Sequence, residues 1–321
     1  MHYNKRVPQS GVSDRTITTV ITMISFTKYS KFYYLFSGIL IVASIASLIV
    51  FGLKFGIEFT GGSTMEIEFS KIRPNNEEIS KSLAQFNLGE IIIQPIRTNG
   101  VILKFKGVDE TTHQSVLSEI NKLSQAEEKS FQYIGPSVGQ ELKNKTIIAI
   151  SLALLAITLY IAFAFRKVSR PVSSWKYGVT SLIALFHDIL IPLGIFSILG
   201  KFYNAEITIP IIAALLTIIG FSVHDTIVIF DRIRENILKS GADSFNKIVD
   251  LSLNQTIGRS ISTVATTLLV MISIFFFGGQ TLKWFSLALI IGITVGAYSS
   301  IFIAGPLLVT WHNISQRKRS S

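Results

Sequence analysis

Residues 32–53 read FYYLFSGILIVASIASLIVFGL, a run of 22 positions without a charged side chain. A helix of about 20 mostly apolar residues is long enough to cross the hydrocarbon core of a bilayer. The small residues at 43–47 resemble a signal-peptide cleavage region. However, the apolar run is longer than the roughly 7–15 residues of such a signal. We therefore expect a retained transmembrane helix.

Five further apolar runs have the same character, at 146–165, 177–199, 207–230, 260–279 and 284–309. The whole chain is 49% hydrophobic and only 16% charged, whereas a soluble domain has about 25% charged residues. This composition predicts a polytopic α-helical membrane protein with six transmembrane helices. The chain has no cysteine, which excludes disulfides, thiolate metal sites and a thiol nucleophile.

The basic residues give these helices a direction. With the N-terminus inside, the inner segments hold 17 Lys and Arg residues, whereas the two short outer loops hold only Lys201 and Lys283. Cytoplasmic loops carry such an excess, so we expect both termini in the cytoplasm. The net charge of +10 belongs to these inner segments, where anionic membrane lipid is the expected partner. A nucleic-acid partner is unnecessary.

The expected division of the chain follows from these runs. It consists of a cytoplasmic tail 1–31, a transmembrane helix 32–53, a periplasmic domain 54–145, a five-helix transmembrane region 146–310 and a basic cytoplasmic tail 311–321.

The periplasmic domain has the pattern of a small α+β fold. Alternating residues predict strands near 63–69, 91–97, 101–106 and 129–134, with Asn99-Gly100 as a hairpin turn. Pro74 and Asp109 suit the starts of two helices, which run to about Phe86 and Gln125. The order strand–helix–strand–strand–helix–strand is that of a ferredoxin-like domain.

Two acidic residues interrupt the apolar runs. His187-Asp188 falls near the middle of the third run, and His224-Asp225 falls in the inner half of the fourth. Ionisable groups inside spans are rare and costly, about 2.5–3.5 kcal/mol each on insertion scales. Carboxyl and imidazole groups can exchange protons, and Arg259, at the start of the fifth run, is at the level of Asp225. A proton relay is therefore one interpretation.

Structural alternatives stand beside it. Asp225 could lie at the end of a shorter span that continues as an interfacial helix, and Asp188 could make a hydrogen bond between helices. A metal site is not expected, because adjacent helical positions point about 100° apart.

Small residues recur every four positions in the sixth run, a pattern typical of close helix packing. They serve either this chain's own bundle or a partner; they are Ala288, Gly292, Gly296, Ser300 and Ala304. The sequence lacks the phosphate-loop, dinucleotide-binding and zinc-protease motifs. We therefore expect no enzyme and no cofactor.

Five ordered motifs, at 56–62, 134–142, 184–190, 220–236 and 253–261, together resemble the SecF branch of the SecD/SecF protein-export family. The resemblance covers about 52–310. It implies a bacterial inner-membrane subunit of the RND-type transporter superfamily that acts with a SecD-like protein. With the SecYEG channel and the SecA motor, the pair would use the proton gradient to promote preprotein export and release.

The resemblance also implies roles for single residues. Asp225 would carry the proton with Arg259 as its partner, and Asp188 matches the third-span motif. The family often has Asn in place of His224, so this chain has a second titratable group there. A junction motif would attach the periplasmic domain; it consists of Gly56, Glu58, Phe59, Thr60, Gly61 and Gly62, with Glu58 where the family more often has Asp.

Two rival functions remain open from the sequence. One is a transporter half that exports a small molecule or lipid by the same relay. The other is a structural membrane subunit without proton coupling.

Overall fold

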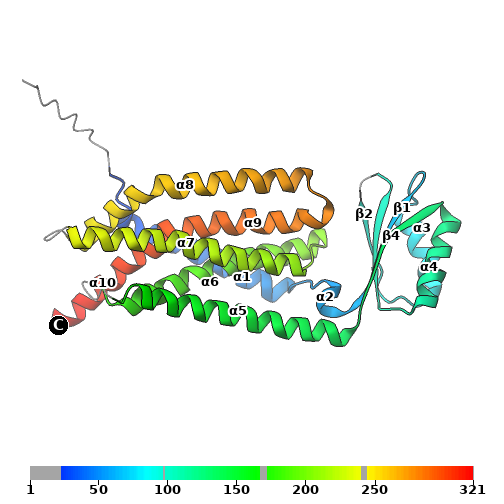
Figure 1. Cartoon of the computed structure of the whole chain (residues 1–321), viewed down its shortest axis with the longest axis horizontal. Coiled ribbons are helices and arrows are strands. Elements are labelled where there is room, and N and C mark those ends of the chain that lie inside the picture. The colour runs from blue at the N-terminus through cyan, green and yellow to red at the C-terminus, as the bar shows by residue number, and fades with distance from the viewer. Residues whose placement is uncertain (1–22, 97, 167–171, 240–243, 321) are drawn as a thin grey trace, which may run out of the picture.

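The computed structural model describes residues 23–96, 98–166, 172–239 and 244–320. Within these ranges, six helices are long and apolar enough to cross a membrane, which confirms the predicted number. Figure 1 shows them side by side, with an α+β domain at one end of the bundle. The helices are α1 (Ser30–Phe51), α5 (Pro136–Ala164), α6 (Ser174–Tyr203), α7 (Ile209–Lys239), α8 (Phe245–Phe277) and the sixth, in which α9 (Gln280–Ser299) continues through a π-helical segment (Ser300–Ala304) into α10 (Gly305–Ser320).

The α+β domain between α1 and α5 has the expected ferredoxin-like order of elements. Its antiparallel sheet has the strand order β2-β3-β1-β4. The elements are β1 (Gly62–Phe69), α3 (Asn76–Leu83), β2 (Ile92–Ile96), β3 (Gly100–Phe105), α4 (Glu110–Leu123) and β4 (Ala126–Ile134).

Capping decides where the two helices of this domain begin. The predicted start of the first helix at Pro74 is wrong, because Asn75 caps the helix: its side chain accepts a hydrogen bond from Glu78 N, and Glu78 accepts one from Asn75 N. The predicted cap at Asp109 is confirmed, since its side chain accepts from Thr112 N.

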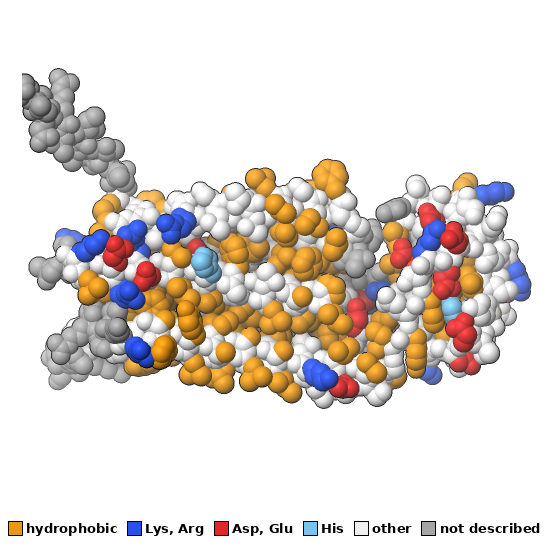
Figure 2. All heavy atoms as spheres, in the orientation of Figure 1, with side chains coloured by type: hydrophobic (Ala, Val, Ile, Leu, Met, Phe, Trp, Pro, Cys, Tyr) orange, Lys and Arg blue, Asp and Glu red, His pale blue; other side chains and the backbone are white. Residues whose placement is uncertain are grey.

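The helices of the bundle differ in how deeply they are buried. About half of the membrane-crossing windows of α6, α7 and the sixth helix is buried, whereas α1, α5 and α8 are mostly exposed. Figure 2 shows the exposed apolar side chains as a broad band along the bundle, with charged side chains gathered at its far end and on the α+β domain. The central helices are therefore α6, α7 and α9.

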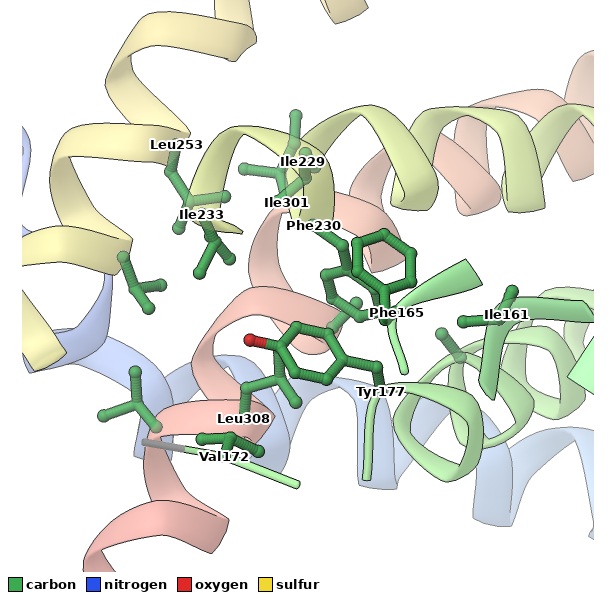
Figure 3. Close-up of a cluster of buried hydrophobic side chains, with 14 of the residues drawn as sticks. Ile161, Phe165, Val172, Tyr177, Ile229, Phe230, Ile233, Leu253, Ile301 and Leu308 are labelled. Atoms are coloured by element: carbon green, nitrogen blue, oxygen red, sulfur yellow. The ribbon is translucent and has the colours of Figure 1, made fainter. Parts of the chain in front are cut away.

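Aromatic packing closes the bundle at the end far from the α+β domain (Figure 3). The Phe165 and Tyr177 rings stack with their centroids 5.2 Å apart, and the Phe230 ring meets Tyr177 edge-on at 5.1 Å. These contacts join the end of α5 to the start of α6 and the middle of α7.

The small-residue face of the sixth helix packs inside the bundle. A Cβ atom added at Gly292 would collide with the side chain of Ile218, and one added at Gly296 would lie 3.1 Å from Ser222 Cβ. Both neighbours are on α7, so these glycines let the backbones of α7 and α9 approach closely.

The close contact at Gly292 makes a testable difference between two glycines. We expect Gly292→Ala to lower the free energy of unfolding by about 1–3 kcal/mol, the usual cost of overpacking a core. Gly220→Ala, on the same pair of helices, meets no atom within 4 Å and should leave stability unchanged or slightly raised. Thermal unfolding of the full chain in detergent measures both; equal stability of the two variants would contradict the packing.

A buried histidine in the α+β domain has a raised pKa. His113 Nε2 lies 2.8 Å from Glu128 Oε2, and its Nδ1 lies 3.1 Å from Glu110 Oε2. The ring stacks on Phe131 with 3.7 Å between centroids. Burial lowers the pKa of His113, but the hydrogen bonds and charges of the two glutamates outweigh this effect and raise the pKa above its usual value.

This raised pKa predicts a pH-dependent stability of the domain. The stabilisation is fully present below about pH 6.5, the unfolded value, and is lost as the pH rises through the folded value. We expect amide exchange of β1 in the full chain, corrected for its intrinsic rate, to show more frequent opening above that range. His113→Gln should remove the dependence; an unchanged profile would refute the assignment.

Candidate functional site

Asp188 lies at the centre of the bundle and joins three helices. It is 1% exposed. The hydroxyls of Ser222 on α7 and Ser299 on α9 donate to its Oδ2 at 2.5 and 2.6 Å. On its own helix, His187 Nδ1 lies 2.9 Å from Asp188 Oδ1. The carboxyl group therefore has three polar protein neighbours, as a buried polar group requires.

The His187 ring lies next to Tyr298, whose hydroxyl makes hydrogen bonds to α1. It lies 6.1 Å from the Tyr298 ring, in a stacked orientation. The Tyr298 hydroxyl donates to Tyr33 O at 3.3 Å and accepts from the Ser37 hydroxyl. His187 Nε2 is buried and has no hydrogen-bond partner among the described residues. The site therefore has an unused donor or acceptor position on this side.

Asp225 occupies the middle of α7. α7 is one continuous helix from Ile209 to Lys239, so no break separates Asp225 from the segment that follows it. The Ser260 hydroxyl of α8 donates to Asp225 Oδ1 at 2.6 Å. The other oxygen, Oδ2, is buried and unpaired within the described ranges. This carboxyl group thus keeps one oxygen available for a further hydrogen bond or proton.

Hydroxyl groups lie between the two carboxylates. Ser222, which donates to Asp188, is three residues before Asp225 on α7. Ser300 donates to Ser222 O at 3.4 Å, and its hydroxyl is 2.8 Å from that of Thr226. Polar atoms on α7 and the sixth helix therefore connect the surroundings of the two acids.

The π-helical segment explains how two successive serines reach this region. Ser299 ends α9 and contacts Asp188, whereas Ser300 begins the π-helical segment and contacts Thr226. A π-helical turn is a rare, wide turn that is frequent at functional sites. Here it coincides with the point where the sixth helix passes both acids.

Arg259 does not pair with Asp225 in the described part of the chain. It is exposed and lines a cavity of about 290 Å³ between α5, α7 and α8, together with Asp231 and Glu235. Its neighbour Ser260 makes the contact to Asp225. His224 is also exposed, so it points away from the interior that Asp225 faces.

Sequence reasoning missed Ser222, Ser260 and Ser299, and it assigned Ser300 only to packing. Each missed serine lies within a few positions of a named residue, but serine is common in spans. Whether a particular serine donates to a buried carboxyl group depends on which helix its side chain faces.

The junction motif forms a compact joint below the sheet. Gly56 leads into the short helix α2 (Ile57–Thr60), and Gly61 and Gly62 have φ values of 74° and 144°. A Cβ atom at Gly61 would lie 2.9 Å from Pro136 Cα, and one at Gly62 would lie 2.9 Å from Phe105 O. Gly61 therefore lets the entry of β1 approach the start of α5, and Gly62 lets it approach the end of β3.

No described group of three or more His, Cys, Asp or Glu side chains could hold a metal ion. The polar site thus consists of two carboxylates and their hydroxyl partners.

The chain thus combines a bundle of membrane-length helices, two buried carboxyl groups and one attached ferredoxin-like domain. Residues 113–314 match the family model "Protein export membrane protein SecD/SecF, C-terminal", and residues 46–71 match "SecD/SecF GG Motif". The chain therefore belongs to the SecD/SecF family, as a protein translocase subunit of the SecF type. It is a transport protein and not an enzyme.

Curated relatives support this assignment along nearly the whole chain. The protein translocase subunit SecF of Thermobaculum terrenum is 43% identical over 304 residues, which cover 91% of this chain and 95% of the relative. The SecF subunit of Rhodothermus marinus is 38% identical over 294 residues, which cover 88% of this chain and 92% of the relative.

Two solved structures share the fold. SecDF from Thermus thermophilus, described as a translocon-associated membrane protein, matches with a TM-score of 0.80 and 30% identity over 91% of this chain. The structure of SecDF in its super-membrane-facing form matches with a TM-score of 0.68 and 30% sequence identity, over 93% of this chain. The chain spans only 39% and 40% of these SecDF chains.

The hydroxyl donors to Asp188 yield a test of the site's packing. We expect Ser222→Ala to destabilise the full chain by about 1–3 kcal/mol, because a buried acceptor loses its donor. Ser262→Ala is the matched control, since its exposed hydroxyl bonds only to Gly258 O of its own helix. Thermal unfolding in detergent compares the two, and an equal effect would show that the Ser222 contact carries no stability.

Proposed function

We propose that the chain acts with a SecD-like protein, the SecYEG channel and the SecA motor as an accessory subunit that uses the proton gradient to promote preprotein export and release. The observation that carries this proposal is the pair of buried carboxylates, Asp188 and Asp225, with hydroxyl groups between them.

The chemistry of the pair suits proton transfer. A carboxyl group can hold or release a proton, and a hydroxyl can donate or accept a hydrogen bond by rotating. Asp225 Oδ2 has no hydrogen-bond partner among the residues that the structure describes, and the Ser260 hydroxyl at Oδ1 can adapt to either protonation state. One charge that crosses 100 mV supplies about 2.3 kcal/mol, enough to shift a conformational equilibrium substantially.

The direction of insertion follows from the basic residues. The predicted inner segments, the N-terminal tail included, hold 17 Lys and Arg residues against two in the short outer loops, which favours a cytoplasmic location for them and for both termini. The α+β domain, at the opposite end of the bundle (Figure 1), would then be periplasmic, on the side where preproteins emerge.

The surface of α7 and α8 supports a second polypeptide. His224 and Arg259 are exposed on these helices, and α8 is mostly unburied across its apolar window. Polar groups within spans usually face protein or water rather than lipid. A SecD-like chain would cover them, consistent with the greater length of the SecDF relatives.

One observation favours the rival of a purely structural subunit. Asp188 makes hydrogen bonds to Ser222 and Ser299, which hold three helices together without any proton transfer. If Asp188 serves only to hold the helices together, Asp225 could be replaced without loss of function. The other rival, export of a small molecule or lipid, has no specific contact in its favour.

Substitution of Asp225 separates these functions. In vesicles that contain the partner and the translocase, we expect Asp225→Asn to abolish the gradient-dependent part of export while the complex still assembles, because the amide cannot carry a proton. Asp231→Asn, at an exposed position of the same helix, is the matched control and should export normally. Undiminished export by Asp225→Asn would refute the relay.

A further inference from the structure

The loop between α6 and α7 makes a direct contact with the α+β domain. Ile207 N donates to Lys54 O at 2.7 Å, and Gly56 N donates to Ile207 O at 2.9 Å. These bonds form a parallel β-bridge between Phe55 and Ile207. The chain that leads from α1 into the domain is therefore held to the loop that joins the two helices carrying Asp188 and Asp225.

A buried ion pair extends this contact into the sheet. Lys104 Nζ, on β3, lies 2.7 Å from Glu206 Oε2, on the loop. Their side chains are only 17% and 5% exposed. Ion pairs on the surface contribute little, whereas breaking a buried pair leaves an uncompensated charge. Removing either group would leave the other charge largely withdrawn from water without its partner, so the pair fixes where the sheet lies relative to the loop.

A second carboxyl group, that of Glu58, lies within electrostatic range of the pair, and its pKa is raised. Burial raises the pKa of Glu58, the charge of Lys104 lowers it, and the charge of Glu206 raises it. Nearby, Lys54 Nζ donates to Asn204 Oδ1 at 2.8 Å, and Gln94 Nε2, on β2, donates to Asn204 O at 3.4 Å. The loop thus meets polar groups from the junction motif and from two strands.

The rest of the domain is attached differently. Gly61 lies against Pro136 and Gly139 of α5 lies against Phe59 O, so the start of the domain packs closely on that helix. On the side of the turn between α8 and α9, a cavity of about 400 Å³ separates the sheet from the bundle. Glu66, Glu68 and Lys129 line it opposite Phe277 and Gly278. There is room for the domain to tilt on that side, but not at the α6–α7 loop.

We propose that the Lys104–Glu206 ion pair and the Phe55–Ile207 bridge form the contact through which movements of α6 and α7 reach the α+β domain. This inference rests on the proposed function, in which a change of protonation at Asp188 or Asp225 moves these helices. Lys104 and Glu206 act as positioning residues: they touch no proton carrier, but they join the loop between the two carriers to the sheet.

The experiment uses the natural absence of cysteine. Spin labels on Ser118→Cys of α4 and Lys201→Cys of α6, both exposed, report the position of the domain relative to the bundle. Pulsed electron paramagnetic resonance measures the label distance in vesicles with the partner and translocase, and export is measured in the same vesicles.

Four variants test the contact. Glu206→Gln is isosteric, and Glu58 remains to compensate Lys104, so the chain should still fold; Lys104→Met is the second disrupting variant. We expect both to broaden the distance distribution and to lose gradient-dependent export. Lys104→Arg keeps the ion pair and should behave as the parent. Lys129→Gln, which breaks an exposed ion pair of the same sheet with Glu127, is the matched control and should also behave as the parent.

The outcomes separate this inference from the proposed function. Unchanged distances in both disrupting variants overturn it, as does a broadened distribution with normal gradient-dependent export. If Asp225→Asn loses that export while Glu206→Gln keeps it, only the inference fails. If Asp225→Asn exports normally, the proposed function fails, and the inference fails with it.

Discussion

Burial of a carboxyl group is the constraint on which the centre of this bundle depends. Asp188 is 1% exposed, so its oxygens need hydrogen-bond donors within the protein, and Ser222 and Ser299 on neighbouring helices supply them to Oδ2. Those bonds require α7 and α9 to approach closely, which the glycines of α9 allow. Smaller shares of the apolar windows of α1, α5 and α8 are buried, although Ser260 of α8 reaches inward to Asp225.

The parts of the fold that follow from local chemistry were predictable from the sequence. Hydrocarbon requires long apolar helices, so all six spans could be found from composition, and side-chain alternation with the Asn99-Gly100 turn gave the order of the domain. The error at Pro74 arose because proline at a helix start is only one of several signals, and the capping box of Asn75 prevails.

The site was predictable only in part, for a different reason. Aspartates within apolar runs are conspicuous, but the identity of their partners depends on which helix faces which. The expected pairing of Arg259 with Asp225 used their common level along the bundle, yet Ser260 makes the contact because adjacent helical positions point in different directions. The residues at the Lys104–Glu206 contact are 102 positions apart, and no local pattern joins them.

The π-helical segment at Ser300–Ala304 has a consequence for how this family can vary in sequence. Such a turn holds one residue more than the α-helical turn that it replaces. Deleting a single residue there would restore a regular α-helix with α10 in nearly the same orientation relative to α9. It would, however, remove the wide turn at which Ser299 contacts Asp188 and Ser300 contacts Thr226. Relatives that keep both acids and their serines should therefore tolerate substitutions in this turn far better than gaps.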